Sequence, residues 1–119
     1  MNLNEQVFRK MGAIDCEVQD PYLDRFESWV KGLQLPNGEE CAISELPALD
    51  SDWPSVVKHL KPVIEDAGYC LEVEMDQTQG HMLVLSDNFM NEERVLIDNW
   101  NFSLAVCKCF MKINTEDFS

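Results

Sequence analysis

The sequence contains no long hydrophobic run. A stretch of about eighteen consecutive apolar side chains is the least that spans a bilayer, and none occurs in the 119 residues. The N-terminal residues Met-Asn-Leu-Asn-Glu also lack the basic and then apolar segments of a secretory signal peptide. We therefore expect a soluble protein of the cytoplasm that has no membrane partner.

Sequence motifs for metal, redox and phosphate chemistry are also missing. Gly38 and Gly80 each stand alone, so no glycine-rich loop is available to hold a phosphate. The cysteines include no Cys-x-x-Cys pair of the kind that binds zinc or performs redox chemistry. Irregularly spaced thiols in an intracellular protein are typically reduced and mostly buried, and we expect this of the five cysteines: Cys16, Cys41, Cys70, Cys107 and Cys109. The sequence therefore predicts no metal ion and no cofactor.

The two histidines leave one metal-site hypothesis and one catalytic hypothesis open. A metal ion would need His81, Cys70 and Glu72 to converge across a hairpin, and no close sequence spacing of ligands supports that site. A cysteine nucleophile would need an imidazole beside it in the fold. A pocket that holds His59 or His81 beside Cys70 or Cys109 would therefore favour an enzyme.

The remaining catalytic candidates have simpler structural explanations. Cys107 and Cys109 are two residues apart, so on a helix their side chains point roughly 200° away from each other and suit packing. Acid pairs such as Glu72 and Glu74 need an apolar pocket to raise a pKa for general acid–base work, and these two lie where solvent is expected. We therefore predict no catalytic residue and no enzymatic activity, with a small hydrolase using a cysteine or a carboxylate as an alternative.

Positive charge is scarce, and the scarcity is uneven along the chain. The sequence has 22 acidic and 9 basic side chains, which give a formal charge of −13. Between Lys31 and Lys58 the sequence has aspartates and glutamates but no lysine or arginine, and the same holds between Lys61 and Arg94. Such a surface repels nucleic acids and anionic membranes and attracts basic partners. Residues 32–93 are therefore expected to carry a negative surface.

The clearest structural signal is a helix followed by a strand over residues 51–75. Ser51 or Asp52 is a suitable N-cap and Gly68 a suitable stop. Apolar residues between them recur at steps of three and four, which predicts one buried stripe: Trp53, Val56, Val57, Leu60, Val63, Ile64 and Ala67. Pro62 falls on the solvent side and predicts a bend. The alternation that follows predicts a strand over residues 69–75 whose buried face holds Tyr69, Leu71, Val73 and Met75.

The N-terminal part is expected to hold two helices and a turn-rich segment. Asn4 is a suitable cap for a helix over residues 5–11. After a linker at residues 15–16, a second helix is expected from Asp20 to Gly32. Its buried stripe would be Tyr22, Leu23, Phe26, Trp29 and Val30. Residues 33–50 contain Pro and Asn-Gly signals and predict turns with short extended pieces.

The C-terminal part is expected to complete an antiparallel sheet and add a last helix. A strand over residues 81–86 would pair with the first as a hairpin, and a third would cover residues 93–98. Asn101 is a suitable cap for a final helix that is apolar on more than one side. The fold class is therefore α+β: one acidic domain over residues 1–119, with a small three- or four-stranded antiparallel sheet packed by about four helices.

Several of these features together resemble the phage ABA-sandwich domain family. They are a first helix ending in Met11-Gly12, the entry from Pro47 to Ser51 into a Trp-containing helix, the antiparallel meander, and the last-helix sequence Leu-Ala-Val-Cys-x-Cys-Phe. The resemblance covers about residues 3–12 and 46–113, with residues 13–45 as an insertion. It implies a three- or four-stranded sheet under helices and a phage or prophage origin, hence the cytoplasm of a host cell. It assigns no catalytic residue.

The negative surface suggests a binding function. Glu72 and Glu74 lie two residues apart on one strand face, about 7 Å, which is near the spacing of successive phosphates in a nucleic-acid strand. We therefore expect the carboxylates to imitate phosphates and occupy a basic surface of a host protein or ribonucleoprotein complex, inhibiting a nucleic-acid-binding or defence complex. The residues assigned to this contact are Asp50, Asp52, Glu65, Asp66, Glu72, Glu74, Asp76, Glu92 and Glu93.

A structural or assembly role is the alternative to inhibition. Trp29, Trp53 and Trp100 are many tryptophans for a chain of this length. A tryptophan left uncovered by its own fold marks an interface, because exposing its large apolar ring to water is energetically unfavourable. Exposed tryptophans would therefore favour a homo-oligomer.

Overall fold

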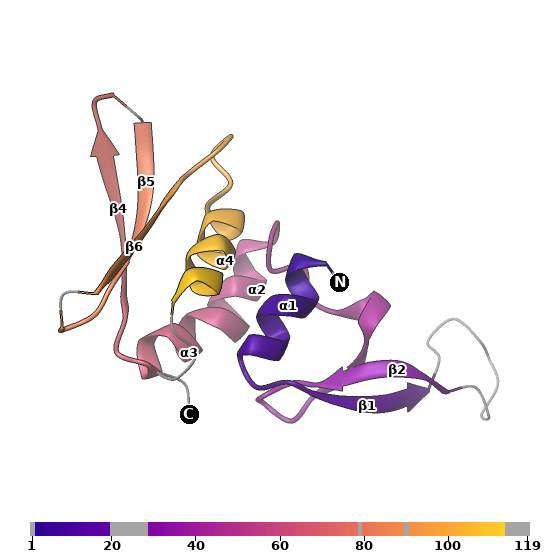
Figure 1. The fold of residues 1–119 in the computed structure, drawn as a ribbon. Helices are drawn as coiled ribbons and strands as arrows, with labels where there is room; N and C mark the ends of the chain where they lie inside the picture. The colour runs from indigo at the N-terminus through magenta and orange to yellow at the C-terminus, as the bar shows by residue number, and fades with distance from the viewer. Residues whose placement is uncertain (1, 20–28, 79, 90, 114–119) are drawn as a thin grey trace. The chain divides into compact units, whose positions relative to one another are not determined.

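Helices and two small antiparallel sheets make up the fold (Figure 1). The structure is a computed structural model that describes residues 2–19, 29–78, 80–89 and 91–113. The chain forms two compact units, Met1–Pro47 and Ala48–Ser119, and each unit holds one three-stranded sheet. The α+β class is confirmed. The expected single sheet is wrong, because the strands divide between two sheets, and the assignment of residues 1–119 to one domain stays a prediction.

The first unit begins with a helix whose cap lies earlier than expected. Helix α1 (Leu3–Lys10) is capped by Asn2, whose side-chain oxygen accepts from the Glu5 amide at 2.8 Å, and not by Asn4. Arg9 in its last turn forms ion pairs with Glu5 at 3.0 Å and with Asp15 at 2.8 Å. The pair with Asp15 ties the end of α1 to the strand that follows.

Two predictions for the first unit are wrong. The expected linker at residues 15–16 lies within strand β1 (Ile14–Gln19), and the expected end of the second helix is strand β2 (Trp29–Gln34). The rest of that expected helix, residues 20–28, lies outside the described residues. Strand β2 pairs with β1 and with β3 (Glu40–Ala42), and a short 3₁₀ turn (Ile43–Glu45) follows. Sheet pairing with partners distant in sequence overrides the local helical spacing here.

Gly32 is not the helix stop that the sequence predicts. It is the buried centre of β2, and a Cβ built there would lie 2.5 Å from the backbone oxygen of Cys41 in the neighbouring strand. Glycine is therefore required for a close approach of two strands and does not end a helix.

The second unit begins with one continuous helix that changes its winding. Segment α2 (Trp53–Ser55) passes into a π segment (Val56–Leu60) and then into α3 (Lys61–Asp66). The π segment ends at Leu60, two residues before the exposed Pro62, and the wider turn accommodates the missing proline amide. Among the described residues the helical stretches are α1, α2 with α3, and the C-terminal α4, so the expected number of about four helices is not matched exactly.

The sheet of the second unit confirms the predicted hairpin. Strand β4 (Cys70–Asp76) pairs with β5 (Gly80–Ser86), which pairs with β6 (Glu92–Leu96), all antiparallel. Helix α4 (Phe102–Lys112) is capped by Asn101, which accepts from the Leu104 amide at 3.0 Å. It packs against β5 and β6 (Figure 1). It is buried on more than one side, as predicted, through Ser103, Ala105, Val106, Cys107, Cys109 and Phe110.

Burial in the second unit departs from the predicted stripes at two places. On the helix, Val56, Leu60 and Ile64 are fully buried. Trp53 and Val57, which were expected in the same buried stripe, are 45% and 43% exposed. On β4, Val73 and Met75 are 51% and 75% exposed although their alternation predicted burial. Helix α4 covers β5 and β6, which leaves apolar side chains on the same face of β4 open.

Candidate binding surfaces

The sheet β4–β6 has two faces, which the strand register defines. Residues directly opposite in antiparallel strands share a face. Val73 and Val95 both flank Leu83 on the inner face, against which α4 packs. Glu72 and Arg94 both flank Val84 on the outer face. The alternation of side chains places two further carboxylates on the outer face, and we call Glu72, Glu74 and Glu92 together the outer acidic face.

A single arginine lies among these three carboxylates. Arg94 forms ion pairs with Glu74 and, at 3.1 Å, with Glu92. Hydrogen bonds to Glu74 first and Glu92 second raise the pKa of Arg94. The pair with Glu74 crosses the central strand, where Val84 is only 1% exposed. Exposed ion pairs contribute little to stability, so the main effect of Arg94 is to position the two carboxylates and to reduce the local negative charge.

The other acids assigned from the sequence do not all join the outer acidic face. Glu93 is half-buried and opposite Leu85, so it lies on the inner face. The side chain of Asp76, at the end of β4, lies outside the described residues. Asp52 precedes α2 and accepts from the Ser55 hydroxyl at 2.6 Å, while the backbone oxygen of Asp50 accepts from Asn101 at 3.1 Å.

Helix length separates these acids further. Asp50 and Asp52 lie before α2, whereas the exposed Glu65 and Asp66 lie at the end of α3. The intervening helix is about 20 Å long at the usual rise. Of the nine assigned carboxylates, the register thus brings together Glu72, Glu74 and Glu92, and it places Glu93 on the other face.

The cysteines of α4 are packing residues, as predicted. Cys107 donates to the Leu49 backbone oxygen at 3.3 Å, and Cys109 donates to the Leu83 backbone oxygen at 3.6 Å. Both side chains are fully buried. Burial raises the pKa of Cys107 to about 12 and that of Cys109 to about 11. A thiol in such surroundings stays protonated at neutral pH and is a poor nucleophile.

The sequence's metal candidates are separated by the hairpin register. Cys70 pairs with Ser86 at one end of the hairpin, and His81 pairs with Met75 toward the other end. Their positions are about 16 Å apart along the strands, and their side chains lie on opposite faces. Within the described residues, no group of three or more His, Cys, Asp or Glu side chains is placed to hold a metal ion.

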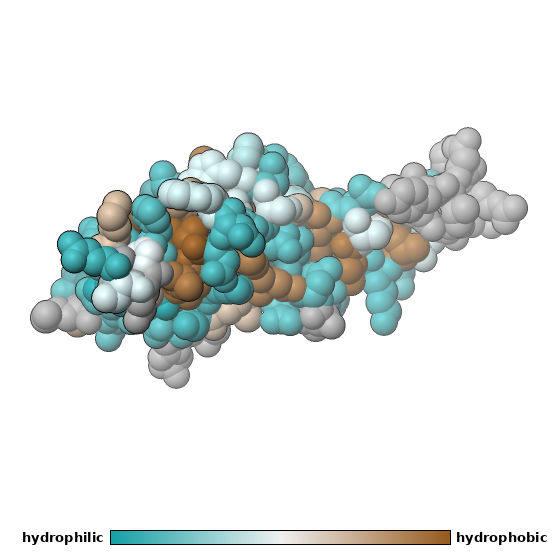
Figure 2. All heavy atoms as spheres, turned by 90° about the horizontal axis from the view of Figure 1, so that it is seen from above, coloured by the Kyte–Doolittle hydropathy of each residue, from teal (hydrophilic) through white to brown (hydrophobic). Residues whose placement is uncertain are grey.

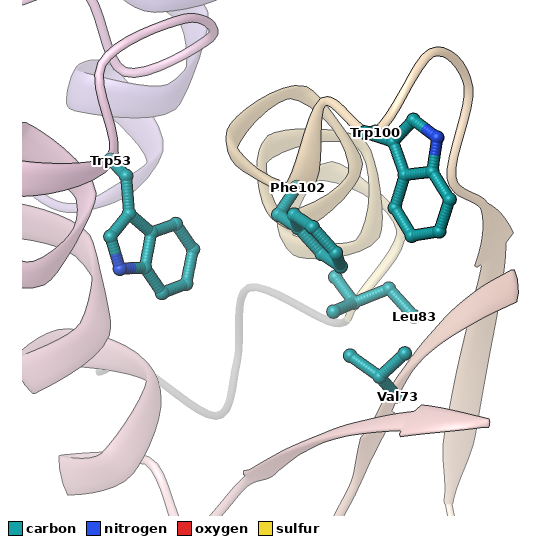
Figure 3. A pocket seen from close by; sticks show the side chains of 5 residues that line it. All are labelled: Trp53, Val73, Leu83, Trp100 and Phe102. Atoms are coloured by element: carbon teal, nitrogen blue, oxygen red, sulfur yellow. The ribbon is translucent and has the colours of Figure 1, made fainter.

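The inner side of the second unit contains an apolar hollow of about 330 Å³. Figure 3 shows Trp53 of α2 on one wall and Trp100 and Phe102 on the other, with side chains of β4 and β5 below them. The lining is almost entirely apolar: Trp53, Val73, Leu83, Trp100 and Phe102. Hydrophobic side chains reach the molecular surface among hydrophilic ones (Figure 2). The hollow exists because Val73 is not covered, which the alternation of β4 did not predict.

Trp100 holds an unusual backbone conformation beside this hollow. Asn99 and Trp100 have φ angles of 52° and 60°, in the left-handed region that non-glycine residues seldom adopt. Such a conformation costs on the order of 1–3 kcal/mol per residue and persists only where the surroundings hold it. Here a hydrogen bond from the Asn101 amide to the Asp98 oxygen, 2.9 Å, closes the turn. The strained turn presents a Trp100 side chain that is 68% exposed.

A second hollow lies on the other side of Trp100. It measures about 310 Å³, and its lining includes His81, Leu96, Asp98 and Trp100. The rings of Trp100 and His81 are 4.8 Å apart between centroids, and those of Trp100 and Phe102 are 6.4 Å apart. No cysteine is among the described residues that line either hollow, so the thiol–imidazole pocket that would favour an enzyme is not formed there.

Comparisons with models of protein families, with curated proteins and with solved structures found no match to this chain. The resemblance to the phage ABA-sandwich family and the phage origin that it implies therefore stay predictions. Among the described residues, no helix combines the length and the apolar character needed to cross a bilayer.

Proposed function

We propose that this protein is a binding module that acts by contact and not by catalysis. Its outer acidic face would seat against the basic surface of a host nucleic-acid-binding protein or ribonucleoprotein complex and inhibit it. The observation that carries the proposal is that the strand register places three exposed carboxylates, Glu72, Glu74 and Glu92, on one face of a sheet. A formal charge of −13 would speed encounter with a basic partner.

The spacing on the outer face supports a phosphate-like role. Glu72 and Glu74 are two residues apart on β4, about 7 Å at the usual rise, and a rigid sheet holds that spacing. Arg94 fixes the orientation of Glu74 and Glu92 through its ion pairs. A preorganised row of carboxylates loses less conformational freedom on binding than mobile side chains would.

The proposal is tested by affinity capture from a nuclease-treated bacterial lysate. The immobilised chain should retain proteins that are released by double-stranded DNA, because DNA would compete for the same basic groove. Retention should fall steeply between about 0.05 and 0.3 M salt, since screening shortens to about 8 Å near physiological ionic strength.

A matched pair of variants locates the contact. The triple change Glu72→Gln, Glu74→Gln and Glu92→Gln should abolish retention. The control is the triple change Glu17→Gln, Glu40→Gln and Glu45→Gln, which removes the same charge from exposed positions of the first unit. This control variant should keep most of the retention. Equal losses in both variants, or retention unchanged in 1 M salt, would argue against the outer acidic face.

Self-association is the second candidate function, and one observation favours it. All three tryptophans remain uncovered by the chain: Trp29 is 60%, Trp53 45% and Trp100 68% exposed. Exposed aromatic rings are typical of interfaces. Light scattering over a range of protein concentrations tests it, and a constant monomer mass would exclude assembly of this chain alone.

A further inference from the structure

The two hollows beside Trp100 differ in chemistry and share one wall. The hollow toward Trp53 is lined by carbon almost throughout, and the lining of the hollow toward His81 includes the exposed acidic residue Asp98. Trp100 lines both. A ligand that fills both must therefore carry an apolar group and, a few ångströms away, a group that suits a carboxylate.

The backbone of Trp100 indicates that its exposure is built into the fold. Two consecutive non-glycine residues, Asn99 and Trp100, hold positive φ angles, and the indole is still 68% exposed. The ring is flanked by His81 and Phe102 but is not buried by them. A strained turn that leaves a large apolar ring in water is more typical of a ligand contact than of a packing solution.

Charge complementarity decides what kind of occupant fits. Asp98 lies in the second hollow, and the exposed Asp52 directly precedes Trp53. A cation near Asp98 would also lie beside the Trp100 ring, which attracts a cation through its π electrons. A second copy of this chain would bring its own formal charge of −13, so repulsion opposes self-association at this place.

We propose that Trp53 and Trp100 hold an apolar side chain of a basic peptide segment, while an adjacent arginine or lysine of that segment lies over Trp100 beside Asp98. The occupant is a segment of a partner protein with one large apolar residue flanked by basic residues. This inference rests on the proposed function, because it names a second contact for the same basic class of partner.

The test follows the indole N–H signals of the ¹⁵N-labelled full chain, which has three tryptophans. The probe is a synthetic heptapeptide with an Arg-Leu-Arg centre. Two matched peptides have Arg-Ser-Arg, which lacks the apolar group, and Gln-Leu-Gln, which lacks the charge. The Arg-Leu-Arg peptide should shift the signals of Trp53 and Trp100 and leave that of Trp29 in place. Each matched peptide should bind about tenfold more weakly or worse.

Variants separate the two parts of the contact. Trp100→Ala should weaken binding of the Arg-Leu-Arg peptide about tenfold or more. Trp29→Ala, which removes a similarly exposed ring from the first unit, should not weaken it. Asp98→Asn should reduce the preference for the Arg-Leu-Arg over the Gln-Leu-Gln peptide. Val73→Ser, at a half-exposed wall position, provides the same test if Trp100→Ala fails to fold.

Three results would overturn the inference: no shift at millimolar peptide, equal shifts of all three indole signals, or shifts that depend on protein concentration without peptide. The lysate capture distinguishes it from the proposed function. If Trp100→Ala retains the captured partner and the outer-face triple variant loses it, the hollows have no role and the proposed function stands. If only Trp100→Ala loses the partner, the outer acidic face has no role and the hollows remain as the contact.

Discussion

The reactivity of each cysteine depends on where its side chain lies. Cys70 is exposed on β4, whereas Cys107 and Cys109 are fully buried in α4 with pKa values raised to about 12 and about 11. At pH 7.5 iodoacetamide should label Cys70 at least about a hundredfold faster than either buried thiol, because the thiolate is the reacting form. Peptide mass mapping measures the rates. Labelling of Cys109 as fast as Cys70 in the folded chain would contradict the burial.

Asp87 should make the loop between β5 and β6 sensitive to acid. Its carboxylate accepts from the amides of Phe89 and Asn91 and from the Asn91 side chain, each at 2.9 Å. The Asn91 side-chain bond is the main cause that lowers the pKa of Asp87. A folded pKa below the unfolded value gives stability that is present above about pH 4 and is lost as the pH falls through the folded pKa.

The Asp87 prediction is measured by urea unfolding. The free-energy difference between the wild type and Asp87→Asn should be constant from about pH 7 to 5 and shrink between about pH 4 and 2. Asp98→Asn, at an exposed position outside that loop, is the control for a lost charge. A difference that does not change with pH would show that the Asp87 charge makes no contribution.

Among the elements, β2 depends on glycine at one position. A Cβ at Gly32 would lie 2.5 Å from the backbone oxygen of Cys41, and the backbone must move to relieve that contact. Gly32→Ala should therefore lower the free energy of unfolding by about 1–3 kcal/mol. Lys31→Ala, at the exposed neighbouring position, should change it by about 0.5 kcal/mol or less. Chemical denaturation followed by circular dichroism measures the stability of both variants. Equal stabilities of Gly32→Ala and Lys31→Ala would mean that β2 and β3 lie farther apart.

Helix α4 is held at its start by Asn101, which acts in two directions. Its side-chain oxygen accepts from the Leu104 amide, and its side-chain nitrogen donates to the Asp50 backbone oxygen at 3.1 Å. Asn101→Ala should cost about 1–2 kcal/mol, since a cap and a neutral hydrogen bond are lost. Asn101→Ser keeps a capping oxygen and should recover about half of the loss. Thermal unfolding gives the order of stability of the wild type and the two variants. A serine variant no more stable than the alanine variant would mean that the loss comes from the hydrogen bond to Asp50 and not from the cap.

The sequence predicted the elements with strong local signals. The hairpin of β4 and β5, the Asn101 cap and the Gly68 stop each depend on residues close in sequence, and the structure confirms them. The expected second helix is wrong in its last residues because β2 takes its pairing partners from β1 and β3. Local spacing carries no information about those partners.

For the whole molecule, the formal charge of −13 should oppose folding at low ionic strength. Raising the salt from about 0.01 to 0.15 M shortens the screening length from about 30 to 8 Å, so repulsion between distant carboxylates weakens. The midpoint of thermal unfolding should rise by several degrees. Scanning calorimetry at both salt concentrations measures it, with the outer-face triple variant showing a smaller rise. A midpoint that falls with salt would mean that ion pairs such as that of Arg94 with Glu92 outweigh the repulsion.

By itself the sequence determined the acidic character, the amphipathic helix before Gly68, the hairpin and the capped last helix. These follow from composition and from interactions within a few residues of each other. Only the tertiary structure decided that the strands form two sheets, that Glu93 faces away from Glu92, and that Val73 stays open beside Trp100. The physical reason is that covering a sheet face depends on where a distant helix packs. Here α4 packs on β5 and β6, and apolar side chains of β4 such as Val73 and Met75 stay exposed.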